Sequence, residues 1–482
     1  MKNAALLTDL YQLTMMQGYM QNDYQDHEAV FDLYFRKNPS GGGYAIAAGL
    51  EQVVDYLENL RFSQEDLDYL CSLNFFDKEF IESLKDFRFN GDIDAVPEGT
   101  VVFPYEPILR VKARIVEAQL IETALLNIIN FQTLIASKAS RIVHAAEGGA
   151  VMEFGLRRAQ GPDGGIMGAR AAFIGGCQST SNVMAGKLFG IPVSGTQAHS
   201  WIQCFPSELD AFRAYARAFP DQCLLLVDTY NVLKSGVPNA IKVGLELEEK
   251  GHRFLGIRID SGDLAYLSRE ARKMLDAAGL HNAKIVASND LDEHTITAIR
   301  AEGAKIDSWG VGTHLITSKD TPALGGVYKL AAEGKDGEIE PRIKVSENIS
   351  KITTPGVKKI VRFYDKKGKA LADLVALDDE KFESPLTIFD PIQTWKRKTL
   401  RNFTTKDLLI PIFRGGKRVY HLPELRDIQA YAQKDLSTFW EEVKRLVNPH
   451  RYIVDLSPKL FELRQALLLD VSNKVEKVGK GD

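Results

Sequence analysis

The sequence contains few cysteines, and none of them forms a motif. Its 482 residues include four, at Cys71, Cys177, Cys204 and Cys223. Without a Cys-x-x-Cys pair, neither a disulfide framework nor a zinc site of ordinary spacing is indicated. The sequence therefore favours a reducing compartment, and we expect a cytoplasmic protein.

An excess of charge of one sign and long hydrophobic runs are also missing. The formal net charge is -4 at pH 7, with both signs spread along the chain, so no basic field for a nucleic-acid backbone is expected. Thr8, Asp9 and Gln12 interrupt the apolar N-terminal segment, which is not typical of a signal peptide. No other stretch approaches the length of a membrane span. We expect neither nucleic acid nor membrane as a partner.

Two common nucleotide-binding motifs are absent. The segment MAGKLF contains Gly186 and Lys187, but Leu188 stands where a P-loop needs Ser or Thr, and the upstream glycine is missing. No GxGxxG opens a βαβ unit, which disfavours a nicotinamide-dependent dehydrogenase. A nucleoside triphosphate, if one is used, must be bound in another way.

The middle of the chain alternates apolar strand candidates with helix-like segments. A composition of 45% hydrophobic and 26% charged residues over this length supports two or more packed domains. The strand candidates are residues 151–156, 191–193, 223–227, 254–259, 284–287 and 308–311. Three of the helical segments end at Gly251, Gly279 and Gly303. This repetition predicts parallel βα units, and both a closed barrel and an open doubly wound sheet fit it.

Polar residues or glycines follow each strand candidate. In a (β/α) barrel the carboxyl ends of the strands converge on one face, where such enzymes build their sites. Six sets in succession therefore favour one shared pocket. The sets are Arg157 and Arg158; Thr196 and His199; Asp228 and Thr229; Arg258 and Asp260; Ser288 and Asn289; and Gly310, Gly312 and Thr313.

Three of these sets also have a purely structural interpretation. Arg258 and Asp260 are two residues apart and so point to the same face of a strand. They would bind an anion and a hydroxyl group together, or form a salt bridge that closes the strand end. The turn at Gly312 would bring N–H groups to a phosphate, or be an ordinary turn. Phe154 with Arg157 would hold a flat anionic ring, or be a core aromatic beside a solvated arginine.

Five longer motifs occur along the chain: LLTDLYQLTM, FGLRRAQGPDGG, SGTQAHSW, IRIDSGDL and GVGTHLIT. Together they resemble the nicotinate phosphoribosyltransferases, which join nicotinate to the ribose of phosphoribosyl pyrophosphate in NAD salvage. The resemblance runs from residue 7 to about 330. It implies the α/β fold of a type II phosphoribosyltransferase, an irregular (β/α) barrel with an additional α/β (α+β) domain.

The resemblance and the patterning together predict three parts. Residues 1–120 form an N-terminal α/β domain that C-terminal segments complete, residues 121–335 form the barrel with the active site, and residues 336–482 pack on the N-terminal domain or at a dimer interface. In this last part, Lys367 and Gly368 are placed like a hairpin turn. Residues 435–449 are typical of a helix with Trp440 on its apolar side. We assign the last part no chemistry.

The resemblance also implies a role for each candidate residue. The family works as a homodimer with shared active sites, and Tyr11 would stack on the pyridine from the neighbouring subunit, opposite Phe154. Asp260 would contact the ribose and offset the positive charge that develops at C1. Asn289 is a weaker candidate for the same pocket. The groups that would hold the nicotinate carboxylate and the phosphates are Arg157, Arg258, Thr196, Gly310, Gly312 and Thr313.

His199 stands in a turn of small residues with no second His or Cys close to it in the sequence. By itself it would cap the turn. The resemblance implies instead that ATP phosphorylates it and that the phosphoenzyme favours transfer, with release of ADP and phosphate. ATP is then a co-substrate, and Mg²⁺ arrives with the diphosphate, with no metal ligand assigned to the protein.

Four other functions stay open. Relatives that accept nicotinamide place an Asp near the amide, whereas residues 175–186 contain no acidic residue, which favours nicotinate. Quinolinate phosphoribosyltransferase shares the fold class but needs extra cations for a second carboxylate. A non-catalytic homologue that binds pyridine nucleotides would tolerate the loss of His199, Asp260 or Arg258, and all three are present. A barrel aldolase or isomerase would need Lys or Glu at a strand end, where we find Arg and Asp.

Overall fold

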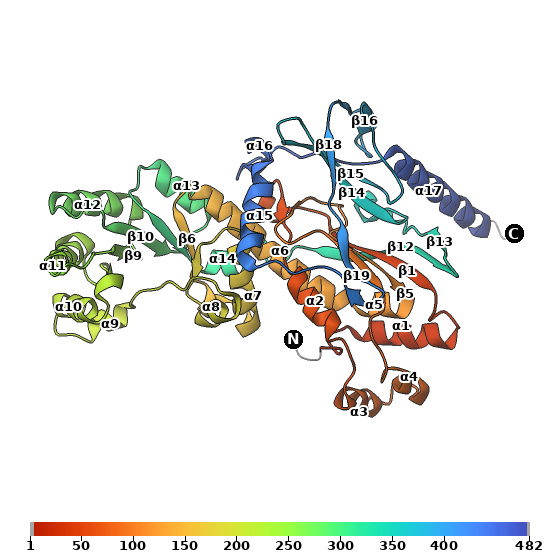
Figure 1. The fold of residues 1–482 in the computed structure, drawn as a ribbon, viewed down its shortest axis with the longest axis horizontal. Helices are drawn as coiled ribbons and strands as arrows, with labels where there is room; N and C mark the ends of the chain where they lie inside the picture. Colours follow the sequence, from red (N-terminus) through yellow and green to blue (C-terminus); the bar gives the residue numbers. More distant parts are fainter. Residues whose placement is uncertain (1–3, 480–482) are drawn as a thin grey trace. The chain divides into compact units, whose positions relative to one another are not determined.

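The computed structural model describes residues 4–479 of the chain. The chain divides into two compact units. The first contains Met1–Leu134 and Ala323–Asp482, and the second is the inserted segment Ile135–Pro322, drawn mainly in yellow and green in Figure 1. Residues from both ends of the sequence therefore belong to one unit.

The inserted unit is built on a parallel sheet of six strands in the order β7-β6-β11-β10-β9-β8. These strands are β6 (Ala150–Glu153), β7 (Ser179–Thr180), β8 (Leu224–Leu226), β9 (Gly256–Ile259), β10 (Lys284–Asn289) and β11 (Ser308–Val311). Five of the six predicted strands are confirmed. The sixth, residues 191–193, forms a single parallel bridge between Val193 and Thr180. The sequence did not predict β7, because two residues are too few to produce a pattern.

Helices connect the strands, so that all strands run in the same direction. Gly279 and Gly303 follow two of these helices with φ of +81° and +79°, a conformation that glycine adopts without a steric penalty and that ends a helix. The helices are α6 (Glu122–Ala145), which leads into β6, then α7 (Gly161–Ile174), α8 (Val183–Phe189), α9 (His199–Gln203), α10 (Glu208–Ala218), α11 (Val237–Glu248), α12 (Leu264–Ala277), α13 (Glu293–Ala301) and α14 (Thr313–Ile316).

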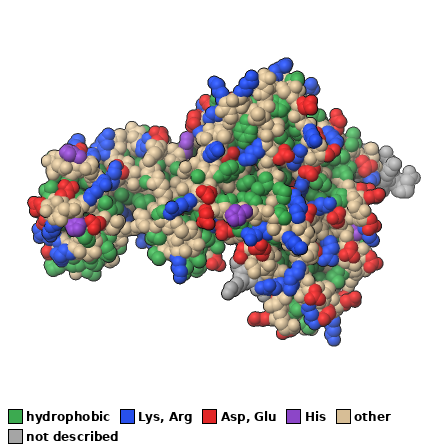
Figure 2. Space-filling model, in the orientation of Figure 1, with side chains coloured by type: hydrophobic (Ala, Val, Ile, Leu, Met, Phe, Trp, Pro, Cys, Tyr) green, Lys and Arg blue, Asp and Glu red, His purple; other side chains and the backbone are tan. Residues whose placement is uncertain are grey.

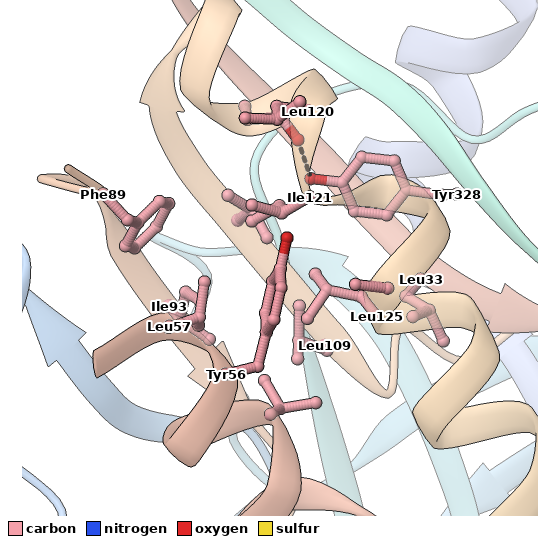
Figure 3. Close-up of a cluster of buried hydrophobic side chains, with 14 of the residues drawn as sticks. Leu33, Tyr56, Leu57, Phe89, Ile93, Leu109, Leu120, Ile121, Leu125 and Tyr328 are labelled. Atoms are coloured by element: carbon pink, nitrogen blue, oxygen red, sulfur yellow. Dashed lines mark hydrogen bonds between the residues drawn. The ribbon is translucent and has the colours of Figure 1, made fainter. Parts of the chain in front are cut away.

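The first unit has a seven-stranded antiparallel sheet in the order β13-β12-β1-β5-β3-β19-β20. Its elements are β1 (Glu28–Phe35), β3 (Asp92–Ala95), β5 (Leu109–Arg114), β12 (Gly326–Lys335), β13 (Glu338–Pro341), β19 (Ile410–Arg414) and β20 (Lys417–Arg418), with the short pair β2 (Ala45–Ile46) and β4 (Val101–Val102) and helices α1 (Leu10–Gln21), α2 (Leu50–Glu58), α3 (Gln64–Ser72), α4 (Lys78–Ser83) and α5 (Ile115–Leu120). Figure 3 shows Tyr56 of α2 among Leu33, Ile93 and Leu109 of this sheet. Because these side chains are fully buried, their removal from water stabilises the unit.

A second sheet in the same unit comes from the C-terminal segment, in the order β18-β14-β15-β21. Its strands are β14 (Lys358–Tyr364), β15 (Ala370–Leu377), β18 (Thr404–Asp407) and β21 (Val454–Leu456). The same segment contains a separate pair, β16 (Leu386–Phe389) with β17 (Arg397–Leu400), and the helices α15 (Leu425–Ser437), α16 (Glu441–Lys444) and α17 (Pro458–Gly479). The predicted hairpin is confirmed, with Gly368 at φ +77° between β14 and β15. The fully buried Arg362 of β14 pairs with Asp373 at 2.7 Å and Asp435 at 3.1 Å. This cluster ties the sheet to α15.

The helix expected over residues 435–449 is wrong. Helix α15 ends at Ser437, and α16 has only four residues. The chain turns here because Phe439 is fully buried, with its ring 5.0 Å from Tyr452 and 5.4 Å from Phe103. Trp440, which we expected on the apolar side, is 49% exposed.

Helix α1 buries only part of the apolar residues at the N-terminus. Leu13 and Met16 of α1 are buried, whereas Leu10 is 52% exposed and Leu6 precedes the helix. Tyr11 is also exposed, at 48%. Helix α1 therefore has a second apolar surface that faces solvent.

Among residues 4–479, no helix is both long enough and apolar enough to cross a membrane. Figure 2 shows Lys and Arg side chains interspersed with Asp and Glu over the visible face, in agreement with the net charge of -4.

Candidate active site

One cavity of about 370 Å³ lies at the carboxyl ends of the parallel strands in the inserted unit. Six of the sequence-predicted site residues line it: Phe154, Arg157, Thr196, His199, Arg258 and Asp260. They come from three different segments, which follow β6, follow Val193, and end β9. The parallel sheet thus brings residues more than a hundred positions apart around one pocket.

Arg258 is the most highly connected side chain of this cavity. Its Nε donates to the Ser288 hydroxyl at 2.8 Å, Nη1 to Thr196 Oγ1 at 3.2 Å and Nη2 to Asp260 Oδ1 at 2.7 Å. The guanidinium also lies 5.7 Å from the centre of the Phe154 ring. Arg258 and Asp260 thus form the salt bridge that the sequence allowed, and both side chains also line the cavity.

Asp228 connects the histidine to this group. Its side chain is 1% exposed and accepts from His199 Nε2 at 3.1 Å. Its second oxygen accepts from the Asp260 backbone N–H at 3.1 Å and the Ser261 hydroxyl at 2.6 Å. A carboxylate oxygen accepts hydrogen bonds, so the hydrogen of this contact is placed on His199 Nε2. The sequence placed Asp228 at a strand end but indicated no role for it.

Gly310 makes room for the Phe154 ring. A Cβ at this position in β11 would lie 2.6 Å from Phe154 Cδ2 and 3.3 Å from the Ser288 Cβ. The ring therefore lies directly against the backbone of β11 and lines the cavity. Gly310 belongs to strand β11, and its role in substrate binding stays a prediction.

Arg157 lines the cavity from an exposed position in the short turn Leu156–Arg158. Three other candidate residues lie outside the lining. Gly312 and Thr313 begin α14, and Asn289 is exposed at the end of β10; within the described residues, none of these three lines the cavity. Their roles stay predictions.

Tyr11 lies on α1, in the first unit. Partial burial raises the pKa of its phenol above the ordinary value, so the ring is neutral at physiological pH. A neutral, half-exposed aromatic ring on a helix surface is suited to stacking.

The acidic residues, histidines and cysteines of the described chain are not clustered as metal ligands. Residues 4–479 contain no group of three or more His, Cys, Asp or Glu side chains placed to hold a metal ion. Asp260 Oδ1 takes the bonds from Arg258 and Ser288, and its carboxylate is 27% exposed.

A parallel α/β sheet with arginines and a histidine around a cavity at its strand ends fits the class of type II phosphoribosyltransferases. Comparisons with known proteins support this class. Three family models match: the nicotinate phosphoribosyltransferase N-terminal domain over residues 6–130, the nicotinate phosphoribosyltransferase family over residues 150–340, and the C-terminal domain over residues 357–464. The chain belongs to the nicotinate phosphoribosyltransferase family, and the sequence resemblance is confirmed.

Individual relatives match over nearly their whole length. The nicotinate phosphoribosyltransferase of Bacillus subtilis (strain 168) is 49% identical over 475 residues, which cover 98% of this chain and 96% of that protein. The human nicotinic acid phosphoribosyltransferase structure superposes with a TM-score of 0.84 at 34% identity, covering 96% of this chain and 99% of the human one. The nicotinate-nucleotide pyrophosphorylase of Pyrococcus furiosus, at 23% identity and a TM-score of 0.70, shares the fold.

Proposed function

We propose that this enzyme acts in NAD salvage and converts nicotinate, phosphoribosyl pyrophosphate, ATP and water to nicotinate mononucleotide, pyrophosphate, ADP and phosphate. The observation that carries the proposal is the contact of His199 with the buried Asp228, which is itself bonded to Asp260. A nucleophile and a carboxylate suited to a cationic transition state thereby border one cavity. The family membership and the near-complete coverage of its relatives support the same conclusion.

Transfer of the phosphoribosyl group needs a flat site for the pyridine and a negative charge near the ribose. The Phe154 ring in the wall of the cavity provides the first, and Arg157 provides an exposed cation for the nicotinate carboxylate. The pyridine nitrogen attacks C1 of the ribose as the bond from C1 to the pyrophosphate oxygen breaks. Asp260 offsets the positive charge that develops at C1, while Arg258 holds Asp260 in place and binds the departing phosphates.

Phosphorylation of His199 couples ATP to this reaction. The imidazole Nδ1 attacks the γ-phosphorus of ATP, an N–P bond forms, and the bond to the ADP oxygen breaks. Asp228 accepts the Nε2 hydrogen bond and stabilises the imidazole as it gains positive charge. Water later releases the phosphate. ATP enters the same cavity, in agreement with the missing P-loop.

Mg²⁺ is the proposed cofactor, carried by the diphosphate. The fit is favourable because Asp260 is partly exposed, so its carboxylate can add one oxygen ligand to those of the diphosphate. When bound, the ion neutralises charge on the leaving group. The protein contributes the position of Asp260, which Arg258 and Ser288 fix.

We also propose a cytoplasmic homodimer with shared sites. Leu10, Tyr11 and Met15 form an exposed apolar surface on α1, at 52%, 48% and 38% exposure. Burial of this surface against a second subunit is favourable. It would deliver Tyr11 to the pyridine opposite Phe154.

The substrate assay tests this proposal. Purified protein with Mg²⁺ and phosphoribosyl pyrophosphate is offered nicotinate, nicotinamide or quinolinate, and the mononucleotide is measured. We expect product from nicotinate, because no acidic residue lies in the segment 175–186. Product from nicotinamide or quinolinate alone would identify a different phosphoribosyltransferase. Binding without turnover would identify a non-catalytic homologue.

A further inference from the structure

Glu153 is a buried carboxyl that the mechanism above does not use. It ends β6, immediately before Phe154, and its side chain is fully buried. One oxygen accepts from the Thr180 hydroxyl at 2.6 Å, and the other accepts from the backbone N–H of Gly155. Burial raises the pKa of Glu153, and these two hydrogen bonds partly offset that rise. An acid buried without a cation among its interactions is costly to keep, so a function is expected of it.

Thr180 gives the contact a fixed direction. Its hydroxyl oxygen accepts from the Asn182 backbone N–H at 3.0 Å, so its single hydrogen is free for Glu153. Its backbone carbonyl accepts from the Ser194 N–H at 2.9 Å, and its own N–H donates to Pro192 at 3.0 Å. Thr180 is thus joined on one side to β6 and on the other to the segment that continues to His199.

The two segments form different walls of the cavity. The chain after Glu153 contributes Phe154 and Arg157, the groups assigned to the pyridine. The chain after Ser194 contributes Thr196 and His199, the groups assigned to phosphate. The contact between Glu153 and Thr180 is a side-chain link between the strand that leads into the first wall and the residue whose backbone pairs with the segment that leads into the second.

We propose that Glu153 and Thr180 are positioning residues, which fix the spacing between the pyridine wall and the phosphohistidine wall so that phosphoryl release is coupled to phosphoribosyl transfer. The inference rests on the proposed function. Backbone pairing holds β6 and β7 together in either case, whereas the hydroxyl–carboxylate bond sets the lateral position of Phe154 and Gly155. If the bond is lost, the buried carboxylate keeps an unsatisfied oxygen and the turn at Gly155 shifts.

A matched pair of substitutions isolates this bond. Thr180→Val removes the hydroxyl and nearly preserves the shape, and Thr180→Ser keeps the hydroxyl. For Thr180→Val we expect the KM for nicotinate and the ratio of ADP to mononucleotide each to rise by about tenfold, since small misplacements of reacting groups cost factors of this size or more. Thr180→Ser should stay within about twofold of the wild type. Partial misfolding changes neither KM nor this ratio, so both readouts exclude a purely structural effect.

A second variant covers the case in which Thr180→Val does not fold, as judged by its thermal midpoint. Glu153→Gln keeps the side-chain length, but its amide group faces either the Thr180 hydroxyl or the Gly155 N–H with hydrogens instead of an acceptor. We expect the same rises in the KM for nicotinate and in the ratio of ADP to mononucleotide. Unchanged KM and unchanged ratio in the folded variants overturn the inference while leaving the proposed function intact. Absence of mononucleotide from the wild type, by contrast, means that the proposed function itself fails.

Discussion

His199 and Asp228 are joined by a hydrogen bond of 3.1 Å from the imidazole Nε2 to a carboxylate that is 1% exposed. The contact links the segment after Val193 to the end of β8, two parts of the sheet that are not paired by backbone hydrogen bonds in residues 4–479. The same carboxylate accepts from the backbone of Asp260. One buried group therefore closes the strand ends and orients the histidine.

This geometry makes Asp228 a direct target. Asp228→Asn should lower ATP-coupled turnover by about 10²-fold or more, because the amide no longer fixes the imidazole hydrogen on Nε2 or stabilises its positive charge. Steady-state kinetics of mononucleotide formation, with and without ATP, check the effect. Ser261→Ala, which removes only one of the three donors to Asp228, serves as the control. Equal losses in both variants would speak against orientation of the histidine.

Gly310 should be intolerant of even a methyl group. Gly310→Ala places a Cβ 2.6 Å from the Phe154 ring, so the ring must move, and the KM for nicotinate should rise by about tenfold. Gly279, after α12, has φ +81° and no atom within 4 Å of an added Cβ. Gly279→Ala strains only this turn and should leave the KM unchanged. A normal KM in Gly310→Ala would show that Phe154 does not hold the pyridine.

The buried ion pairs of Arg362 should dominate the stability of the C-terminal sheet. Arg362→Met leaves Asp373 and Asp435 without their cation and should lower the free energy of unfolding by about 3–5 kcal/mol. Urea denaturation measures this loss. The half-exposed pair Arg213–Glu246 offers a contrast, since Arg213→Ala should change stability little. If the two substitutions lowered the free energy of unfolding by similar amounts, the buried ion pairs of Arg362 would not dominate the stability of this sheet.

Asp455 should give the protein a specific pH dependence. Burial and then the charge of Asp390 raise its pKa to about 6, so the folded state favours the protonated acid. Its contribution to stability is complete below the unfolded pKa of about 4 and is lost as the pH rises through about 6. Asp455→Asn should therefore raise the free energy of unfolding at pH 7.5 by about 1 kcal/mol, after allowance for screening.

The test is the comparison of two pH values. Urea unfolding of the wild type and of Asp455→Asn at pH 7.5 and pH 4.5 should show a difference that shrinks at the lower pH. A difference that stays constant would mean that Asp455 does not titrate in this range.

The sequence predicted most of the parallel strands of the inserted unit, because each of these strands is a short apolar run, and the polar residues that end or follow β6 and β9 line the cavity. It could not predict the bond between His199 and Asp228, since two segments that are not paired in the sheet meet only after the strands have assembled. Nor could it choose between Phe439 and Trp440, because periodicity does not tell which of two adjacent aromatics turns inward. The buried role of Glu153 was equally hidden, as one acid in an apolar strand has no pattern of its own.

Phosphorylation of His199 is the central claim, and transfer of radioactive phosphate from γ-labelled ATP tests it most directly. The wild type and a His252→Ala control, altered at a surface histidine paired with Asp221, should each take up about one acid-labile phosphate per chain. This phosphate should be released when nicotinate and phosphoribosyl pyrophosphate are added, and His199→Ala should take up none. Full labelling of His199→Ala, or no labelling of the wild type, would contradict the account.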